Sequence, residues 1–170
     1  VSRVGESLGF KQTALYYVSI FVEDPPAWDL VGNRTPQTKI GRLNFEDSNS
    51  RDLAHLLLSG RLAFWWWSIT GDDFDVTGAG LKSFPIEIRN LQPIKTRLLT
   101  LAHQLSKKQL KSPLVTKYNG MQVGNYDMLK CREVTDEADR LVLGHLGLGH
   151  YWGDILLANN LMFKSTDNSE

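Results

Sequence analysis

Acidic residues are the first candidates for chemistry, because carboxylates hold the divalent metals that assist phosphodiester cleavage. Asp75 and Glu87, followed by Arg89, have suitable residue types, but the lysine that customarily follows the acid is absent. His145 and His150 lie five positions apart and would need a third ligand to hold one metal. A metal-dependent nuclease is therefore only a remote interpretation of these carboxylates. The two histidines are better explained as capping or packing residues.

The tripeptide Asp24-Pro25-Pro26 directly follows an apolar segment, residues 14 to 22. Amino-group DNA methyltransferases place a polar residue, Pro-Pro and an aromatic residue after a strand. The polar oxygen and a carbonyl then accept hydrogen bonds from the target amine while the aromatic ring stacks on the extruded base. Here Ala27 takes the fourth position and Trp28 comes one place late. A plain turn is the preferred interpretation, because a short motif without its structural context is weak.

Cofactor binding has little support in the sequence. The residues before Ala14 leave no room for a cofactor-binding half-sheet. The glycines of the segment GHLGLGH, residues 144 to 150, have the reverse of dinucleotide-loop spacing and follow no strand. No serine or cysteine has a nucleophile-elbow context. We therefore expect no cofactor, no metal and no complete catalytic site in this chain.

Charge is balanced in sum and polarised along the chain, with 19 Lys and Arg against 19 Asp and Glu. Between residues 87 and 132, nine basic residues face two acidic ones, whereas residues 133 to 170 contain seven acidic and two basic residues. This distribution suits a molecule that presents one positive face to phosphates. Solvated helix faces produce similar runs, so charge alone leaves both interpretations open.

Location is suggested by features that the sequence lacks. The single cysteine, Cys131, cannot form an internal disulfide, and no signal-peptide pattern begins the chain. No apolar stretch approaches the roughly twenty residues that span a bilayer. We therefore expect a cytoplasmic protein with no membrane partner. The chain begins at Val1 without Met, as a processed protein or an excised fragment would.

Strands and helices are mixed without a regular alternation, which predicts a single α+β domain over residues 1–170. Strands are expected at residues 14–22 and 38–45. A helix should begin near residues 47–50, and Gly60 is expected to bend or divide it. Further helices are expected at residues 135–143 and 151–161, and the polar tail from Lys164 to Glu170 is expected to be disordered.

A central basic helix and a β-hairpin are the two elements expected to carry function. Pro93 should open the helix, whose residues Leu98, Leu101 and Leu105 share one face while lysines and arginines occupy the other. Asn119-Gly120 lies between two short strand-like runs and is a strong hairpin signal. We expect a basic hairpin to follow the basic helix.

The aromatic run from Phe64 to Trp67 cannot enter one core stripe, because consecutive helical residues point in several directions. At least one of these rings should be exposed or at an interface. Packing against a neighbouring domain and stacking on a base both explain such exposure, and packing is the preferred interpretation.

The segment Leu56 to Ile86 resembles the C-terminal specificity region of bacterial N6-adenine DNA methyltransferases of type IIG-like restriction-modification systems. In that family a helix with a small residue, a basic residue, Leu and aromatics leads into Gly-Asp-Gly-Phe, Val-Thr and Phe-Pro. The matching residues are Ser59, Arg61, Leu62, Phe64 to Trp67, Gly71, Asp72, Phe74, Val76, Thr77, Phe84 and Pro85. Departures occur at Asp73, where the family often has Gly, and at Asp75, where it has a basic residue or His.

A second block also resembles the ends of such methyltransferases, and the two blocks cover about half the chain. It contains Gly120, Val123 to Tyr126, Lys130 to Arg132 and Val134 to Asp136. The resemblance implies a target-recognition domain that grips double-stranded DNA. A separate catalytic methyltransferase domain of the full-length protein would bind S-adenosylmethionine and flip the adenine.

Residue type and turn location select the expected DNA contacts, since Asn and Gln suit adenine whereas Lys and Arg suit phosphates and guanine. The expected contacts are Lys117, Asn119, Gln122, Asn125, Lys130 and Arg132, with Thr77 and Lys82 as second choices. The alternative is a structural or protein-interaction module whose tryptophan cluster docks on a catalytic partner. That module would have solvated charges and no affinity for DNA.

Overall fold

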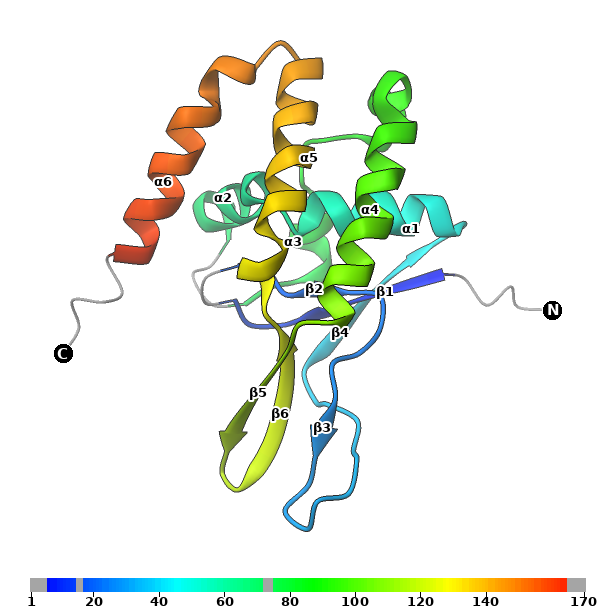
Figure 1. The fold of residues 1–170 in the computed structure, drawn as a ribbon, viewed down its shortest axis with the longest axis vertical. Helices are drawn as coiled ribbons and strands as arrows, with labels where there is room; N and C mark the ends of the chain where they lie inside the picture. Colours follow the sequence, from blue (N-terminus) through cyan, green and yellow to red (C-terminus); the bar gives the residue numbers. More distant parts are fainter. Residues whose placement is uncertain (1–5, 15–16, 72–74, 165–170) are drawn as a thin grey trace.

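The structure, a computed structural model, describes residues 6–14, 17–71 and 75–164. It confirms the expected α+β class, with helices gathered over two small antiparallel sheets (Figure 1). The first sheet has the order β2-β1-β4 and contains β1 (Glu6–Lys11), β2 (Ile20–Phe21) and β4 (Ile40–Phe45). The second has the order β3-β6-β5 and contains β3 (Ala27–Trp28), β5 (Pro113–Tyr118) and β6 (Met121–Tyr126).

The strand expected over residues 14–22 is much shorter in the structure, where only β2 pairs with β1. Val18, Ile20 and Phe21 are nonetheless buried, so the apolar run reflects core packing more than extended pairing. Residues 15 and 16 lie outside the described residues. Strand β1 was not predicted, and it pairs with all of β4, from Glu6 opposite Phe45 to Lys11 opposite Ile40.

Helix α1 (Ser48–Leu58) begins where the sequence predicts, because Asp47 Oδ1 accepts a hydrogen bond from the Ser50 amide at 2.9 Å. Every residue from 52 to 58 is buried. The helix contacts β1 and β4 as well as α4 (Lys95–Leu110) and α5 (Arg132–His145). Helix α1 is therefore the middle layer of the molecule, with core on two sides.

The predicted basic helix is α4, which follows the 3-10 turn η1 (Ile88–Ile94). Leu98, Leu101 and Leu105 are at most 1 % exposed, which confirms the face predicted from their spacing. They pack in one cluster with α1 and with Val134 and Val142 of α5. Each fully buried leucine contributes about 2 kcal/mol of burial free energy, so this cluster anchors the helical layer.

Gly60 divides the predicted long helix, and α2 (Arg61–Thr70) begins immediately after it. A short helix, α3 (Gly78–Lys82), follows and contacts β4. The turns η2 (Met128–Cys131) and η3 (Gly149–Tyr151) precede α5 and α6 (Trp152–Lys164), which confirms both predicted C-terminal helices. The tail prediction concerns residues 165–170, which lie outside the described residues. Among the described helices, none is long and apolar enough to cross a bilayer.

Candidate nucleic-acid interface

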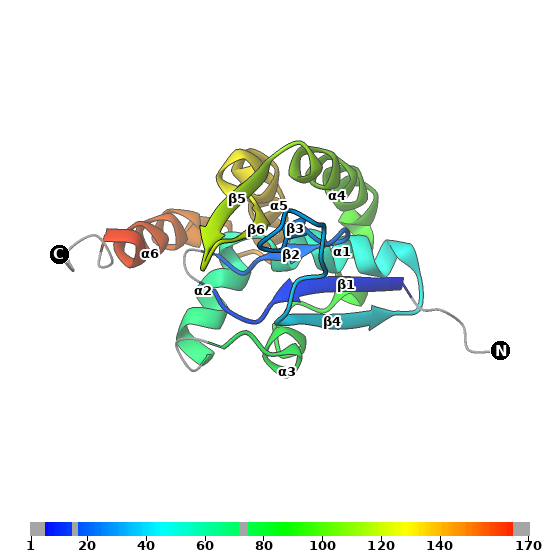
Figure 2. The same cartoon turned by 90° about the horizontal axis from the view of Figure 1, so that it is seen from below.

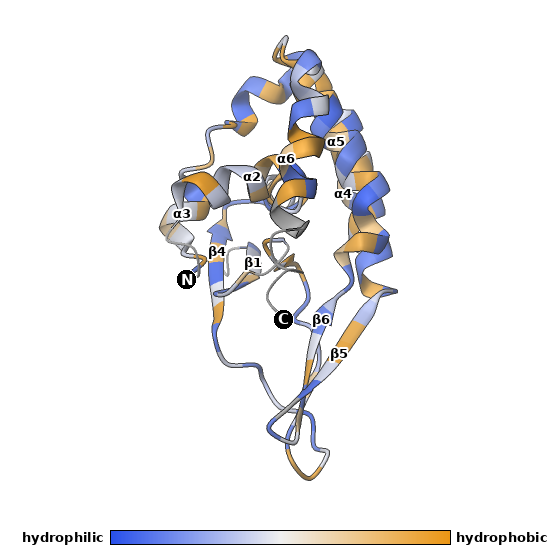
Figure 3. Ribbon diagram, turned by 90° about the vertical axis from the view of Figure 1, so that its left-hand side faces the viewer, coloured by the Kyte–Doolittle hydropathy of each residue, from blue (hydrophilic) through white to orange (hydrophobic). Residues whose placement is uncertain are grey.

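The hairpin predicted from Asn119-Gly120 is formed by β5 and β6. Asn119 has φ 48° and Gly120 has φ 80°, as the two central residues of a type I′ turn require. Strand β3 and the loop after it lie beside the hairpin, and together they extend away from the helices (Figures 1 and 3). We call residues 27–36 and 113–126 the arm.

Four residues form a row across the arm. Lys117 is paired with Gln122, Gln122 with Trp28, and Trp28 forms an isolated bridge with Arg34. Directly paired residues on neighbouring strands place their side chains on the same face of a sheet. Arg34, Gln122 and Lys117 are exposed and Trp28 is half-buried. The row thus combines two cations, an amide and an aromatic ring.

The arm has little negative charge to oppose these cations. Its one acidic residue, Asp29, uses Oδ1 to accept hydrogen bonds from the backbone amides of Asn33 at 2.8 Å and Val31 at 3.0 Å. These hydrogen bonds hold the pKa of Asp29 below its usual range, and the bond from the Asn33 amide has the largest effect. The carboxylate therefore organises the turn that carries Arg34 back beside Trp28.

Polar side chains fix the base of the arm to the body. Gln37 Nε2 donates to the carbonyls of Pro25 and Gly124, both at 2.8 Å, and Lys11 Nζ donates to the Gly124 carbonyl at 2.8 Å. A Cβ at Gly124 would lie 2.1 Å from the Pro26 carbonyl oxygen, so this glycine permits the close approach of two backbone segments. The arm is therefore held rigidly where it leaves the first sheet.

The Asp-Pro-Pro motif belongs to this base. Asp24 forms an ion pair with Arg42 of β4. The carbonyls of Pro25 and Pro26 both lie within hydrogen-bond reach of Gln37 Nε2, at 2.8 Å and 3.4 Å. These contacts give each residue of the motif a structural partner, in keeping with the plain-turn interpretation.

Four of the expected DNA contacts belong to the arm, and three of them, Lys117, Asn119 and Gln122, lie together at its turn. Asn125 is at the base and half-buried, with Oδ1 accepting hydrogen bonds from Ser19 Oγ at 2.5 Å and from the Tyr126 amide at 2.9 Å. Its oxygen is therefore used inside the molecule. Lys130 is exposed on η2, with Nζ 3.7 Å from Asp127 Oδ2.

Arg132 lies in the interior, 8 % exposed. It shares one face of α5 with Asp136 and Asp139, and burial lowers the pKa of its guanidinium, as does the nearby charge of Arg61. Arg61 itself pairs with Asp136 at 2.7 Å. A phosphate contact requires an exposed guanidinium, so Arg132 does not join the arm residues, and its location at a helix start gave no sign of this burial.

The second-choice residues lie elsewhere. Thr77 Oγ1 caps α3 by accepting a hydrogen bond from the Gly80 amide at 3.0 Å, and Lys82 is exposed at the end of that helix. Figure 2 shows α3 beside β4, across the first sheet from the arm. Thr77 and Lys82 are therefore not part of the arm surface.

The basic face of α4 is partly neutralised by α5, which packs beside it. Arg97 pairs with Glu137, and Lys108 Nζ lies 2.8 Å from Glu133 Oε2. The acidic run that follows the basic block in sequence thus contacts that block in space. Helix α4 therefore presents fewer unpaired positive charges to solvent than the sequence suggested.

No family model, curated protein or solved structure matches this chain. Function is therefore inferred from the residues of this chain and their geometry. Within the described residues, no group of three or more His, Cys, Asp or Glu side chains could hold a metal ion. The arm presents two cations, side-chain amides and an aromatic ring, which can form hydrogen bonds and pair with anionic groups.

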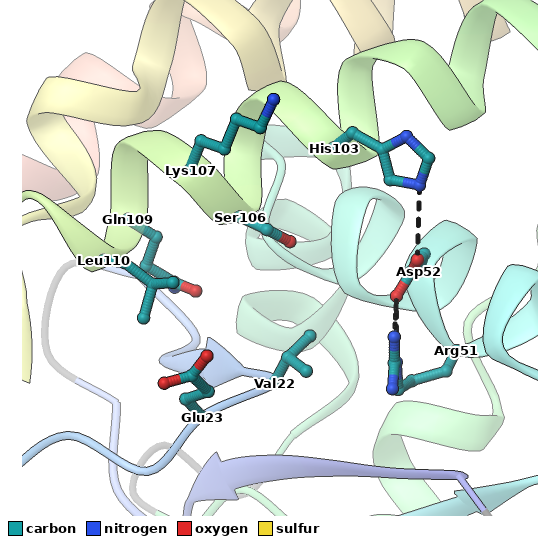
Figure 4. Close-up of a pocket in the computed structure, with 9 residues that line it drawn as sticks. All are labelled: Val22, Glu23, Arg51, Asp52, His103, Ser106, Lys107, Gln109 and Leu110. Carbon is teal, nitrogen blue, oxygen red and sulfur yellow. Dashed lines mark hydrogen bonds and ion pairs between the residues drawn. The ribbon is translucent and has the colours of Figure 1, made fainter.

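A second polar surface lies between α1 and α4, in a hollow of about 350 Å³ (Figure 4). Arg51 and His103 lie on either side of Asp52, at 2.7 Å and 3.7 Å from its carboxylate oxygens. Ser106 Oγ lies 3.4 Å from Nδ1 of His55. The imidazole of His55 is buried, and this burial lowers its pKa to about 4. Cations and carboxylates alternate here, so the hollow favours no anionic partner.

Sequence reasoning missed Arg34 and Trp28, because the stretch after the prolines had the composition of a loop. Gly32-Asn33, with Gly32 at φ 87°, was the available signal. A tight turn between Asp29 and Asn33 returns the chain on itself, and so brings Arg34 opposite Trp28.

Proposed function

We propose that the arm contacts double-stranded DNA and that the chain is the target-recognition domain of an N6-adenine DNA methyltransferase. The row of Arg34, Trp28, Gln122 and Lys117 is the observation that carries the proposal. A two-stranded ribbon fits the DNA major groove, which is about 12 Å wide. The hairpin of β5 and β6 is such a ribbon, and β3 and Arg34 lie beside it, so that the row has a cation at each end.

Each residue of the row has a role that its chemistry suits. Arg34 and Lys117 pair with phosphates and set the register of the domain on the duplex. Gln122, with Asn119 at the turn, presents an amide that can bond the N6 and N7 edge of adenine. Trp28 lies between Arg34 and Gln122 in the row and offers an apolar surface to a thymine methyl group or a sugar.

The wider assignment rests on the resemblance of residues 56–86 to methyltransferase specificity regions. Asp72 and Phe74, two residues that carry the resemblance, lie outside the described residues. In the proposed enzyme, a catalytic domain in the full-length protein binds S-adenosylmethionine and flips the adenine, while this chain holds the duplex. The isolated chain should therefore bind DNA and give no heat when titrated with S-adenosylmethionine.

Fluorescence anisotropy with a labelled duplex of randomised sequence tests the arm, since non-specific affinity falls with salt in proportion to the phosphates contacted. The double variant Arg34→Ala/Lys117→Ala should flatten the plot of log K against log salt concentration by about 1.8, at about 0.9 per contact. Lys82→Ala, which removes an exposed lysine outside the arm, is the matched control and should leave the slope unchanged. Equal slopes for the wild type and the double variant would contradict the proposal.

Selection of bound duplexes from the randomised pool tests base recognition. Asn119→Gly preserves the left-handed turn while removing the amide, and Gln122→Ala removes the second amide. Each variant should select a less defined sequence than the wild type while retaining its salt slope. An unchanged selected sequence in both variants would place base recognition outside the arm.

A further inference from the structure

An apolar cavity of about 680 Å³ lies on a part of the molecule that does not include the arm. Its walls come from α2, residues 84–86, the end of α5, the turn after it and the first half of α6. This volume is within the range of about 300 to 1,000 Å³ that is usual for small-molecule sites. The tryptophans that the sequence singled out contribute here, since Trp65 and Trp66 both line the cavity.

Aromatic rings from three segments meet around this cavity. Trp65 and Trp66 come from α2, Phe84 from the segment after α3, and Tyr151 from η3. Leucine, isoleucine, proline and alanine supply most of the remaining wall. Flat faces of Trp and Tyr attract cations through their electron-rich rings.

One charged residue, Asp154 in the first turn of α6, lines the cavity. Within the described part of the chain, none of the ion pairs involves Asp154. Arg140 of α5 lies over the ring of Trp152, 5.0 Å from its centroid. The Asp154 carboxylate is exposed at the edge of an aromatic wall and is thus open to a cationic occupant of the cavity.

We propose that this cavity binds a small organic ammonium ion with apolar substituents. The aromatic faces and Asp154 attract the positive charge, and the aliphatic wall buries the substituents. A neutral apolar ligand gains only the second contribution, and an anion is repelled by the carboxylate. The site does not depend on the DNA proposal, because none of its residues belongs to the arm.

Matched probes separate charge from apolar burial. Choline and its uncharged isostere 3,3-dimethylbutan-1-ol differ in the charge and not in the shape of the branched head, and benzyltrimethylammonium adds an aromatic substituent. Binding is followed through the indole N–H resonances, assigned with the variants Trp65→Phe and Trp66→Phe. Choline should bind at least about five-fold more tightly than the alcohol, as expected for a cation at aromatic faces. Benzyltrimethylammonium should bind more tightly than choline.

Asp154→Asn should weaken choline binding several-fold and leave the weak binding of the alcohol unchanged. Glu46→Gln, which removes an exposed carboxylate between β4 and α1, is the control and should change neither affinity. Equal affinity for choline and the alcohol would overturn the proposal, and would identify an apolar surface suited to packing against a catalytic domain. Indole resonances unmoved by all three probes would overturn it as well.

Discussion

The carboxylate of Asp139 caps helix α2 from α5, and it occupies the space that the missing side chain of Gly60 leaves open. Asp139 Oδ2 accepts hydrogen bonds from the backbone amides of Arg61 at 2.7 Å and Leu62 at 3.3 Å. Gly60, at the N-cap position, has no side chain to satisfy these amides. The contact therefore links the break between α1 and α2 to helix α5, since Arg61 and Asp139 are 78 positions apart in the chain.

Gly60→Ala should destabilise the protein because a Cβ there would lie 2.4 Å from Asp139 Oδ1. The carboxylate would have to withdraw and lose its bonds to α2, at a cost of about 2 kcal/mol in the free energy of unfolding. Urea denaturation of the wild type and the variant measures this difference.

Gly144→Ala is the matched control, since a Cβ at Gly144 meets nothing within 4 Å. Gly144 lies within α5, where alanine is favoured over glycine, so this substitution should stabilise by roughly 0.5 kcal/mol. Similar destabilisation by both substitutions would show that the Gly60–Asp139 contact is not the cause.

Asp139 should make stability depend on pH. Burial raises the pKa of its carboxyl from 3.8 to about 7, against the opposing effect of the amide hydrogen bonds. Between these values the folded protein keeps a proton that the unfolded chain has released, so the free energy of unfolding falls as pH rises. Asp139→Asn removes this titration. The free energy of unfolding of the wild type should therefore fall relative to that of the variant as pH rises through this window. A constant difference from pH 4 to pH 7 would contradict the shifted pKa.

His55 should act in the opposite direction. Burial lowers the pKa of its imidazole from 6.5 to about 4, so between these values the unfolded chain binds a proton that the folded protein does not. The free energy of unfolding therefore rises with pH in this window. In His55→Leu this contribution is absent, and its stability relative to the wild type should improve on acidification. Urea midpoints at several pH values test this, and a parallel response of the two proteins would refute it.

Arg132→Met should raise the stability of the protein and leave the salt dependence of DNA binding unchanged. The guanidinium is buried, none of its three nitrogens has a hydrogen-bond partner among the described residues, and burial and the charge of Arg61 both lower its pKa. A buried methionine avoids this desolvation cost, so the free energy of unfolding should rise by about 1 kcal/mol. The salt slope should equal that of the wild type, because a buried group releases no counterions from DNA. A flatter slope in a folded Arg132→Met protein would return this residue to the interface.

Local sequence signals predicted the elements that depend on neighbouring residues. Asn119-Gly120 specified the hairpin because few residue pairs accept two positive φ angles in succession. Leu98, Leu101 and Leu105 specified the buried face of α4 through their helical spacing. Residues 14–22 misled, since a buried run of apolar residues has the same composition whether or not it pairs along its length.

The sequence by itself determined the α+β class, the division at Gly60, the hairpin turn and three of the residues on the arm. Tertiary structure decided which charges face solvent. Helices α4 and α5 pack together, so Lys108 meets Glu133 and Arg97 meets Glu137, and the two opposite charge runs partly cancel. Pairing across β3 and β6 brings Trp28 into the row with Lys117. Charge and contact depend on distances in space, which a one-dimensional count of lysines and arginines does not contain.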